Sequence, residues 1–160
     1  MAMLEMKLDG VMYDVLKRPI VILRYEDRIL PILVGNAEAF AIANGMEKVE
    51  MPRPMTHDLI TFILRGFQTS LQSVQVYKLE GGTFYAYLIL NQQGNGGEEV
   101  SSIIKIDCRP SDAIALAVRT SSPIYVEEEV LRIAGQDSIP QEDFEAGEEE
   151  EDEGEEDFLE

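Results

Sequence analysis

The sequence predicts an α+β fold in which a mostly antiparallel sheet packs against helices. Paired runs rich in Val and Ile are separated by turn residues, which is typical of β-hairpins. Other segments carry apolar residues three and four positions apart, and this spacing is typical of helices. Because 45% of the 160 residues are apolar, the chain can fill the core of one ordinary domain.

Two runs of β-branched residues predict a first hairpin. The runs PIVILRY (19–25) and ILPILVG (29–35) flank the turn candidate EDR, and their Val and Ile content favours strands over a helix. Pro31 has no amide hydrogen to donate, so we expect the second strand at a sheet edge or at a bulge.

Two helices are expected after this hairpin. The first covers NAEAFAIANG (36–45), with Asn36 as its cap and Gly45 as its end. The second begins at Thr56, next to the only histidine of the chain, His57. Its apolar residues recur at helical spacing, so we expect them to fall on one face of this helix. These residues are Leu59, Ile60, Ile63, Leu64 and Phe67.

The second half of the chain repeats this order. SVQVYKL (73–79) and TFYAYLIL (83–90) flank the turn EGG and predict a hairpin, and VSSIIKIDC (100–108) predicts a further strand. A third helix begins at Ser111, and its stretch AIALAV is apolar on every side, so we expect it to be buried. A last short helix covers EEEVLRIAG (127–135).

The two halves share a short pattern that predicts an internal duplication. EAFAIA at 38–43 and DAIALA at 112–117 both read acid, Ala, apolar, Ala, apolar, Ala. Strand-like residues precede each stretch, and a segment with proline and another helix follow it. The repeated unit would therefore be a hairpin, a strand and two helices.

Composition divides the chain into a domain over residues 1–135 and an acidic tail over residues 136–160. Of the 31 acidic residues, 13 lie between residues 142 and 160, which leaves 18 against 13 Lys and Arg and gives the body a charge of about −5. The tail has no apolar period and repels itself, so we predict that it is disordered.

The start of the chain and its one cysteine indicate a cytoplasmic protein. Charged residues interrupt the first thirty positions, so no apolar stretch there is long enough for a signal peptide or a membrane span. Cys108 is alone, which excludes an internal disulfide and a metal site of several cysteines. We expect Cys108 to be a small core residue.

Carboxylates stand in the first turn of three predicted helices: Glu38, Asp58 and Asp112. A structural explanation exists for each, since an acid near a helix start offsets exposed N–H groups and the helix dipole by about 0.3 to 2 kcal/mol. Ser111, beside Asp112, shows no sign of being an activated nucleophile.

An Arg-Pro pair precedes two of these helix starts, at Arg53 and at Arg109. A residue before proline is held extended, so each guanidinium could project beside the helix end. Phosphate is the ligand that such a site would attract, because guanidinium groups and helix N-termini both donate N–H groups to its oxygens. The alternative is that Arg53 and Arg109 pair with Asp58 and Asp112.

His57 follows the expected start of its helix by one residue, so we expect it to be at least partly accessible to solvent. Three interpretations are open: a surface or interface histidine, a general base in hydrolysis, or a metal ligand together with Asp58. The sequence contains no nucleophile elbow, glycine-rich phosphate loop or zinc spacing.

Several segments together resemble the bifunctional nuclease (BFN) domain family over residues 4–134. They are LPILVGNAEAFAIA, PRPMTHDLI, GTFYAYLIL and, most specifically, IDCRPSDAIALAVRTSSPIYVEEEVL. The resemblance implies DNase and RNase activity. The characteristic polar positions of the family fall here on Glu38, Arg53, Thr56, His57, Asp58, Asp107, Arg109, Ser111, Asp112 and Arg119.

From these residues we predict a metal-dependent nuclease. Its catalytic residues would be His57, Asp58 and Asp112, and substrate would bind to Arg53, Arg109 and Ser111. Glu38, Asp58 and Asp112 would hold Mg²⁺ or Mn²⁺, because hard carboxylate oxygens suit these ions. The prediction requires that the helix starts near Thr56 and Ser111 meet in one pocket that water can reach.

The alternative is a non-enzymatic binding or regulatory module whose Arg-Pro and Asp motifs are structural. The net charge favours this alternative, because a nuclease gains affinity for nucleic acid from Lys and Arg side chains that contact phosphates. Residues 1–135 are net acidic and contain no basic run. A homodimer is also expected, through the apolar hairpins and the possible edge strand at Pro31.

Overall fold

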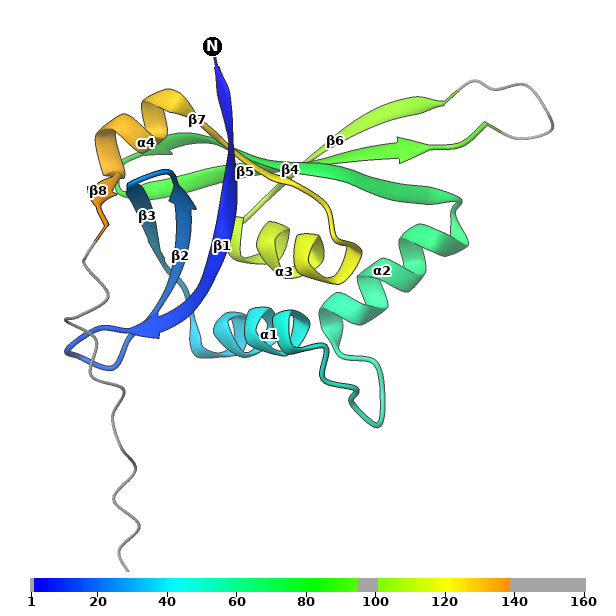
Figure 1. Cartoon of the computed structure of the whole chain (residues 1–160). Helices are drawn as coiled ribbons and strands as arrows, with labels where there is room; N and C mark the ends of the chain where they lie inside the picture. Colours follow the sequence, from blue (N-terminus) through cyan, green and yellow to red (C-terminus); the bar gives the residue numbers. More distant parts are fainter. Residues whose placement is uncertain (1, 95–100, 139–160) are drawn as a thin grey trace, which may run out of the picture.

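A computed structural model describes residues 2–94 and 101–138, and eight strands of these residues form one sheet, in the order β6-β5-β4-β7-β1-β2-β3-β8 (Figure 1). Two antiparallel three-stranded meanders, β1 to β3 and β4 to β6, make up most of it. The strands are β1 (Met3–Tyr13), β2 (Pro19–Tyr25), β3 (Arg28–Leu33), β4 (Thr69–Glu80), β5 (Thr83–Gln92), β6 (Ser102–Cys108), β7 (Ile124–Glu127) and β8 (Gln136–Asp137).

The short strand β7 joins the two meanders. It pairs in parallel with β4, where Val74 is opposite Ile124, and antiparallel with β1, where Met3 is opposite Glu127. The other strand pairs that the structure describes are antiparallel. The predicted fold class, a mostly antiparallel sheet with packed helices, is confirmed.

Pro31 lies at a sheet edge, as predicted. One side of β3 pairs with β2, whereas β8 pairs with its other side only at Arg28 and Ile29. The missing amide hydrogen of Pro31 therefore costs no bond between β3 and β8.

Strand β8 also shows that Gln136 and Asp137, which we assigned to the tail, belong to the sheet. The tail from residue 139 onward lies outside the described residues.

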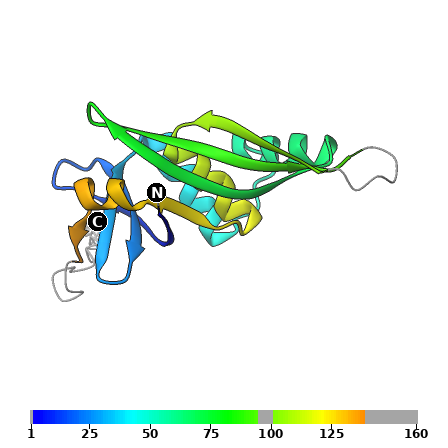
Figure 2. The ribbon, with the colours of Figure 1, turned by 90° about the horizontal axis from the view of Figure 1, so that it is seen from above.

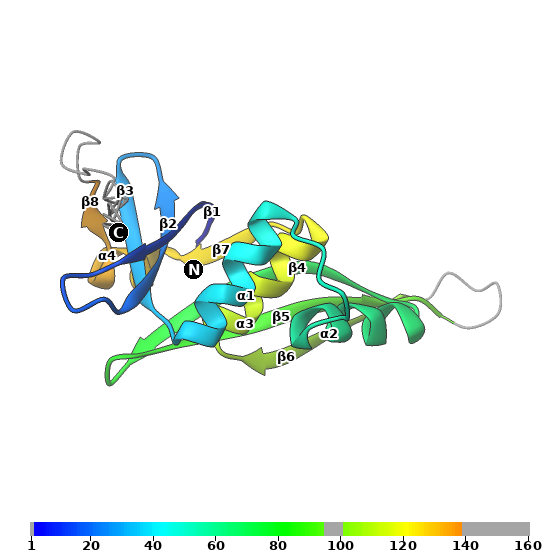
Figure 3. The same ribbon diagram turned by 90° about the horizontal axis from the view of Figure 1, so that it is seen from below.

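The described residues form four helices beside the sheet, and three of them gather on one face of it (Figures 1 and 3). They are α1 (Asn36–Glu47), α2 (Thr56–Gly66), α3 (Pro110–Thr120) and α4 (Glu128–Ala134). Helix α3 packs on β4 and β5, and both α1 and α2 pack against α3. Seen from above, the strands of the second meander lie in front of α3 (Figure 2). No helix among the described residues is long and apolar enough to cross a membrane.

Helix α3 is buried as predicted, because Ala113 to Ala117 are each at most 2% exposed. Both predicted hairpins are confirmed as well. In each half a meander is followed by a helix, but β7 separates α3 from α4, whereas no described strand separates α1 from α2. The internal duplication stays a prediction.

The predicted ends of the helices need correction. Gly35, rather than Asn36, occupies the cap position of α1, whereas α2 begins at Thr56 as predicted, with Met55 in its cap position. Helix α1 continues past Gly45 to Glu47, and Lys48 after it adopts a left-handed conformation. Gly45 instead permits a close approach to α3, because a Cβ there would lie 2.5 Å from Cγ2 of Val118. The glycine serves helix packing and not helix termination.

The apolar face of α2 is buried only in part. Leu59, Ile63 and Phe67 are 51%, 48% and 69% exposed, whereas His57 and Thr61 are buried. Helix α2 lies at one end of the described structure, where it packs mainly against α3 and β4 (Figure 1). Its apolar residues therefore extend beyond the surface that its neighbours can cover.

Candidate functional site

The first turns of α1, α2 and α3 face one cavity of about 330 Å³, which we call the site cavity. The predicted meeting of the helix starts near Thr56 and Ser111 is confirmed. One part of the wall is charged and consists of Glu38, His57, Asp58, Arg109, Asp112 and Arg119. The rest is mostly apolar and includes Phe40, Val49, Met51 and Met55.

His57 reaches from the first turn of α2 to the first turn of α3. Its Nε2 lies 3.0 Å from Oδ1 of Asp112. The expectation that His57 is accessible to solvent is wrong, since the residue is only 8% exposed, although it still lines the cavity. An ionised carboxylate can only accept hydrogen bonds, so Nε2 carries the hydrogen and Nδ1 is the basic nitrogen of the neutral ring.

Arg109 bridges α3 and α1. It precedes Pro110 with an extended backbone, at φ −74° and ψ 146°. Its Nε and Nη2 donate to the two carboxylate oxygens of Asp112 at 2.8 and 3.1 Å, and its Nη1 donates to Oε1 of Glu38 at 2.9 Å. The predicted pairing of Arg109 with Asp112 is therefore confirmed. Bonds to Asp112 first, and then to Glu38, raise the pKa of Arg109 further above its usual value.

Both carboxylates that hold Arg109 are ionised in the folded protein. Burial would raise the pKa of Asp112, but bonds from Arg109 and His57 outweigh it and hold that pKa below its usual value. A bond from its own backbone N–H, and then one from Arg109, lower the pKa of Glu38. Gly35 leaves room for this carboxylate, because a Cβ there would clash with Oε2 of Glu38.

Asp58 pairs with Arg119 and not with Arg53, which corrects the prediction. Oδ1 of Asp58 accepts from Nε of Arg119 at 2.8 Å, and Oδ2 accepts from the N–H of Met55 at 3.0 Å. The Met55 bond first, and then the Arg119 bond, lower the pKa of Asp58. Arg119 also donates to the carbonyl oxygens of Ala41 and Ala115, so it joins three helices.

The remaining predicted site residues lie outside the site cavity. Arg53 is exposed in the segment before α2, and Ser111 is buried, at 7% exposure, in the first turn of α3. Neither lines the cavity. Cys108 packs against the core, as predicted. Burial, followed by the charges of Asp112 and Asp107, raises its pKa to about 12, which disfavours the nucleophilic thiolate form.

The predicted metal ligands Glu38, Asp58 and Asp112 do not fit a metal ion in this arrangement. Both oxygens of Asp112 and of Asp58, and Oε1 of Glu38, already accept bonds from N–H groups. Among the residues that the structure describes, no group of three His, Cys, Asp or Glu side chains is placed to hold a metal ion. Arginine takes the place that the prediction gave to the ion.

Sequence reasoning missed the role of Arg119 in this site. A signal was present, because Arg119 ends the otherwise apolar stretch AIALAV of a helix that was expected to be buried. A buried guanidinium needs partners, and its side chain here is only 10% exposed. Its partners on the other two helices, Asp58 and Ala41, lie 61 and 78 positions away in the chain, so no local pattern could identify them.

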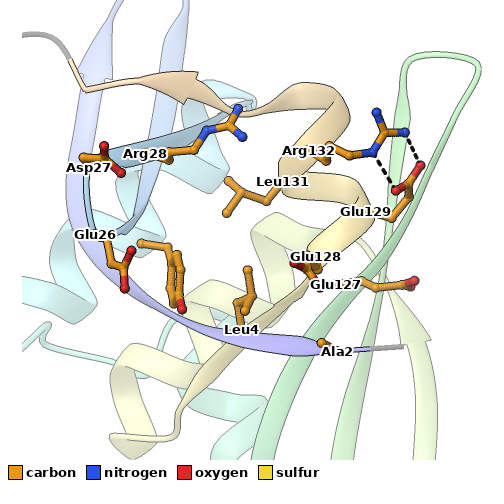
Figure 4. Close-up of a pocket in the computed structure, with 11 residues that line it drawn as sticks. Ala2, Leu4, Glu26, Asp27, Arg28, Glu127, Glu128, Glu129, Leu131 and Arg132 are labelled. Atoms are coloured by element: carbon orange, nitrogen blue, oxygen red, sulfur yellow. Dashed lines mark hydrogen bonds and ion pairs between the residues drawn. The ribbon is translucent and has the colours of Figure 1, made fainter.

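A second cavity, of about 380 Å³, lies between the start of β1, the β2–β3 turn and α4 (Figure 4). It is lined by several acidic residues and by Arg28 and Arg132, and Arg132 pairs with Glu129 on α4 (Figure 4). It contains neither the histidine nor any residue of the Arg-Pro pairs. We therefore assign the chemistry to the site cavity, although it is the smaller of the two.

Comparison with known proteins agrees with the resemblance seen in the sequence. The family model described as "Bifunctional nuclease domain" matches residues 21–138. "Uncharacterized protein Rv1829" of Mycobacterium tuberculosis is 45% identical over 120 residues, which cover 74% of this chain and 67% of that protein. "Bifunctional nuclease 1" of Arabidopsis thaliana is 32% identical over 120 residues, which cover 73% of this chain and 36% of the plant protein. The chain thus spans about a third of that plant relative, and it belongs to the bifunctional nuclease domain family.

Proposed function

We propose that this protein hydrolyses phosphodiester bonds of nucleic acid in the site cavity. The observation that carries the proposal is the contact of His57 with ionised Asp112, beside Arg109, where three helix starts meet. A base, a group that orients it and a donor for phosphate are what hydrolysis requires. The family, and the plant relatives that are named bifunctional nucleases, support the same conclusion.

In the proposed reaction, Nδ1 of His57 removes a proton from the attacking hydroxyl or water. At the same time the oxygen of this nucleophile forms a bond to phosphorus. Asp112 stabilises the imidazolium that forms. Arg109, whose side chain is 63% exposed, exchanges Glu38 for a phosphate oxygen and stabilises the charge of the transition state. The bond from phosphorus to the leaving oxygen breaks, and the proton on His57 is transferred to that oxygen. The Mg²⁺ or Mn²⁺ dependence predicted from the sequence is not part of this proposal, because the donor set does not fit.

The test is cleavage of labelled DNA and RNA oligonucleotides by the full chain. We expect His57→Ala and Asp112→Asn each to lower the rate about 100-fold or more. Asp107→Asn is the matched control, since this exposed carboxylate on β6 does not line the cavity. Equal rates in all variants would mean a contaminating nuclease and would refute the proposal.

A second candidate is a non-enzymatic binding or regulatory module. It is favoured by the complete pairing of the charged groups, because the bonds of Arg109 and Arg119 also join α1, α2 and α3. The cavity side chains, three carboxylates and two guanidinium groups, carry a net charge near −1 when His57 is neutral. In this case Asp112→Asn would lower the thermal stability, and wild-type protein would cut neither DNA nor RNA.

Nucleic acid as the partner, a cytoplasmic location and a homodimer belong to the same proposal. The location rests on the sequence alone. The dimer is supported by the exposed apolar residues of α2, and its test is given at the scale of the whole molecule below.

A further inference from the structure

We propose that Arg109 occupies the cation position of the site cavity in place of a divalent metal ion, so that removing its guanidinium turns Glu38 and Asp112 into a metal site. The inference rests on the proposed function for its catalytic meaning. Its test measures metal binding and needs no cleavage.

The geometry of Arg109 carries the first step. Its guanidinium lies between two carboxylates from different helices and donates three bonds, of 2.8, 2.9 and 3.1 Å. Asp112 binds it through both oxygens, as a carboxylate would bind one ion. A metal ion held by Glu38 and Asp112 would need these same oxygens.

The net charge of these three side chains is the second argument for the inference. Glu38, Asp112 and Arg109 together carry one negative charge, whereas the two carboxylates alone would carry two. A divalent ion that entered beside Arg109 would be repelled by the guanidinium. Without the guanidinium, two carboxylates and the neighbouring imidazole of His57 would offer oxygen and nitrogen ligands that suit Mn²⁺.

The solvent exposure of these side chains is the third argument for the inference. The Arg109 side chain is 63% exposed, whereas the carboxylates beneath it are 21% exposed at Glu38 and 28% at Asp112. Removing the guanidinium would open the carboxylates to water and to hydrated ions rather than leave a closed hole. The consequence for the native protein is that its site holds a permanent cation and does not depend on metal supply.

The experiment compares Mn²⁺ binding to the full-length wild type, Arg109→Gln and Arg132→Gln. Paramagnetic broadening of the amide signals of His57 and Asp112 reports on the site, which separates it from weak binding to the acidic residues 142–160 that all variants share. Arg132 is the matched control, because it is 67% exposed and pairs with the carboxylate of Glu129 outside the site cavity.

We expect no selective broadening at His57 and Asp112 in wild type or Arg132→Gln, and Mn²⁺ affinity at least about tenfold higher at this site in Arg109→Gln. Selective broadening in wild type would overturn the inference, and so would a folded Arg109→Gln without a gain in affinity. If Arg109→Gln fails to fold, Arg109→Met keeps a side chain of similar length and is judged by the same outcomes. If the wild type cleaves nucleic acid and also binds Mn²⁺ in the site cavity, this inference is refuted but the proposed function is not. If the variants bind Mn²⁺ as expected but the wild type cleaves no nucleic acid, only the proposed nuclease function is refuted.

Discussion

At the scale of single residues, Asp112 is the centre of the site. Its two oxygens accept three hydrogen bonds, two from Arg109 and one from His57. Bonds to the ionised form lower the pKa of the carboxyl, and a lowered pKa in the folded state is a contribution to stability that depends on pH. The site residues therefore also hold the helices together.

The pKa values of Asp58 and Asp112 in the folded protein lie below their usual value of 3.8. We therefore expect their contribution to the stability of the fold to be complete above about pH 4 and to be lost as the pH falls through these lowered pKa values. The contribution of Asp112 should be about 1 kcal/mol, because solvent screens this partly exposed group. Urea unfolding between about pH 7 and about pH 2.5 would measure it. Asp112→Asn should show a weaker dependence on pH than wild type, with Asp107→Asn as control. Identical slopes in all three proteins would contradict the prediction.

Part of this site could be predicted from the sequence. The acids at the helix starts and the bond from Arg109 to Asp112 are local, because these two residues are three positions apart. The pair of Asp58 with Arg119 and the burial of His57 were not predicted, because they depend on how α2 packs against α3. Residue types could be read from the chain, but partners across helices could not.

At the scale of elements, α3 determines where the other two helices lie. Hairpins and the buried α3 were predicted because their patterns are local and strong: alternating β-branched runs and a helix that is apolar on every side. The outward face of α2 was not predicted. Apolar spacing indicates which residues share a face, but not whether a neighbour covers that face.

We expect Gly45→Ala to lower the free energy of unfolding by about 1 to 3 kcal/mol, because the added methyl group would press on Val118 and on Arg119. Chemical denaturation of both variants would measure the change. Gly66→Ala in α2 is the matched control, since a Cβ there meets nothing within 4 Å, and it should be neutral or slightly stabilising. Equal stability of the two variants would show that α1 and α3 can move apart without cost.

At the scale of the whole molecule, the exposed stripe of α2 predicts a contact with a second copy of the chain. Leu59, Phe62, Ile63 and Phe67 are 48% to 69% exposed, and their spacing of three and four positions places them along one side of the helix. The same stripe on two copies can pack against itself around a two-fold axis. The hairpin edge at Pro31, from which the dimer was first predicted, is partly paired with β8.

Light scattering after size exclusion should therefore show a dimer for wild type and a monomer for the double variant Phe62→Ser, Phe67→Ser. Four partly exposed side chains are few beside the roughly 20 to 30 residues per partner of a standard interface, so we expect the dimer to be concentration-dependent. Leu16→Ser is the control, because Leu16 in the β1–β2 turn is as exposed as Phe67, at 69%. A monomeric wild type at all concentrations, or dissociation of the control, would refute this interface.

Strand β7 has a consequence for the order of events during synthesis. It is the only described strand that pairs with both meanders, and the ribosome synthesises it after residue 123. Until it leaves the ribosome, the two meanders share no hydrogen-bonded neighbour, and every contact between them spans a long stretch of chain. His57 emerges with the first half and Asp112 with the second. The nascent chain thus carries its histidine for more than fifty residues before Asp112 is made, so the contact between these two residues can form only after α3 has begun to emerge.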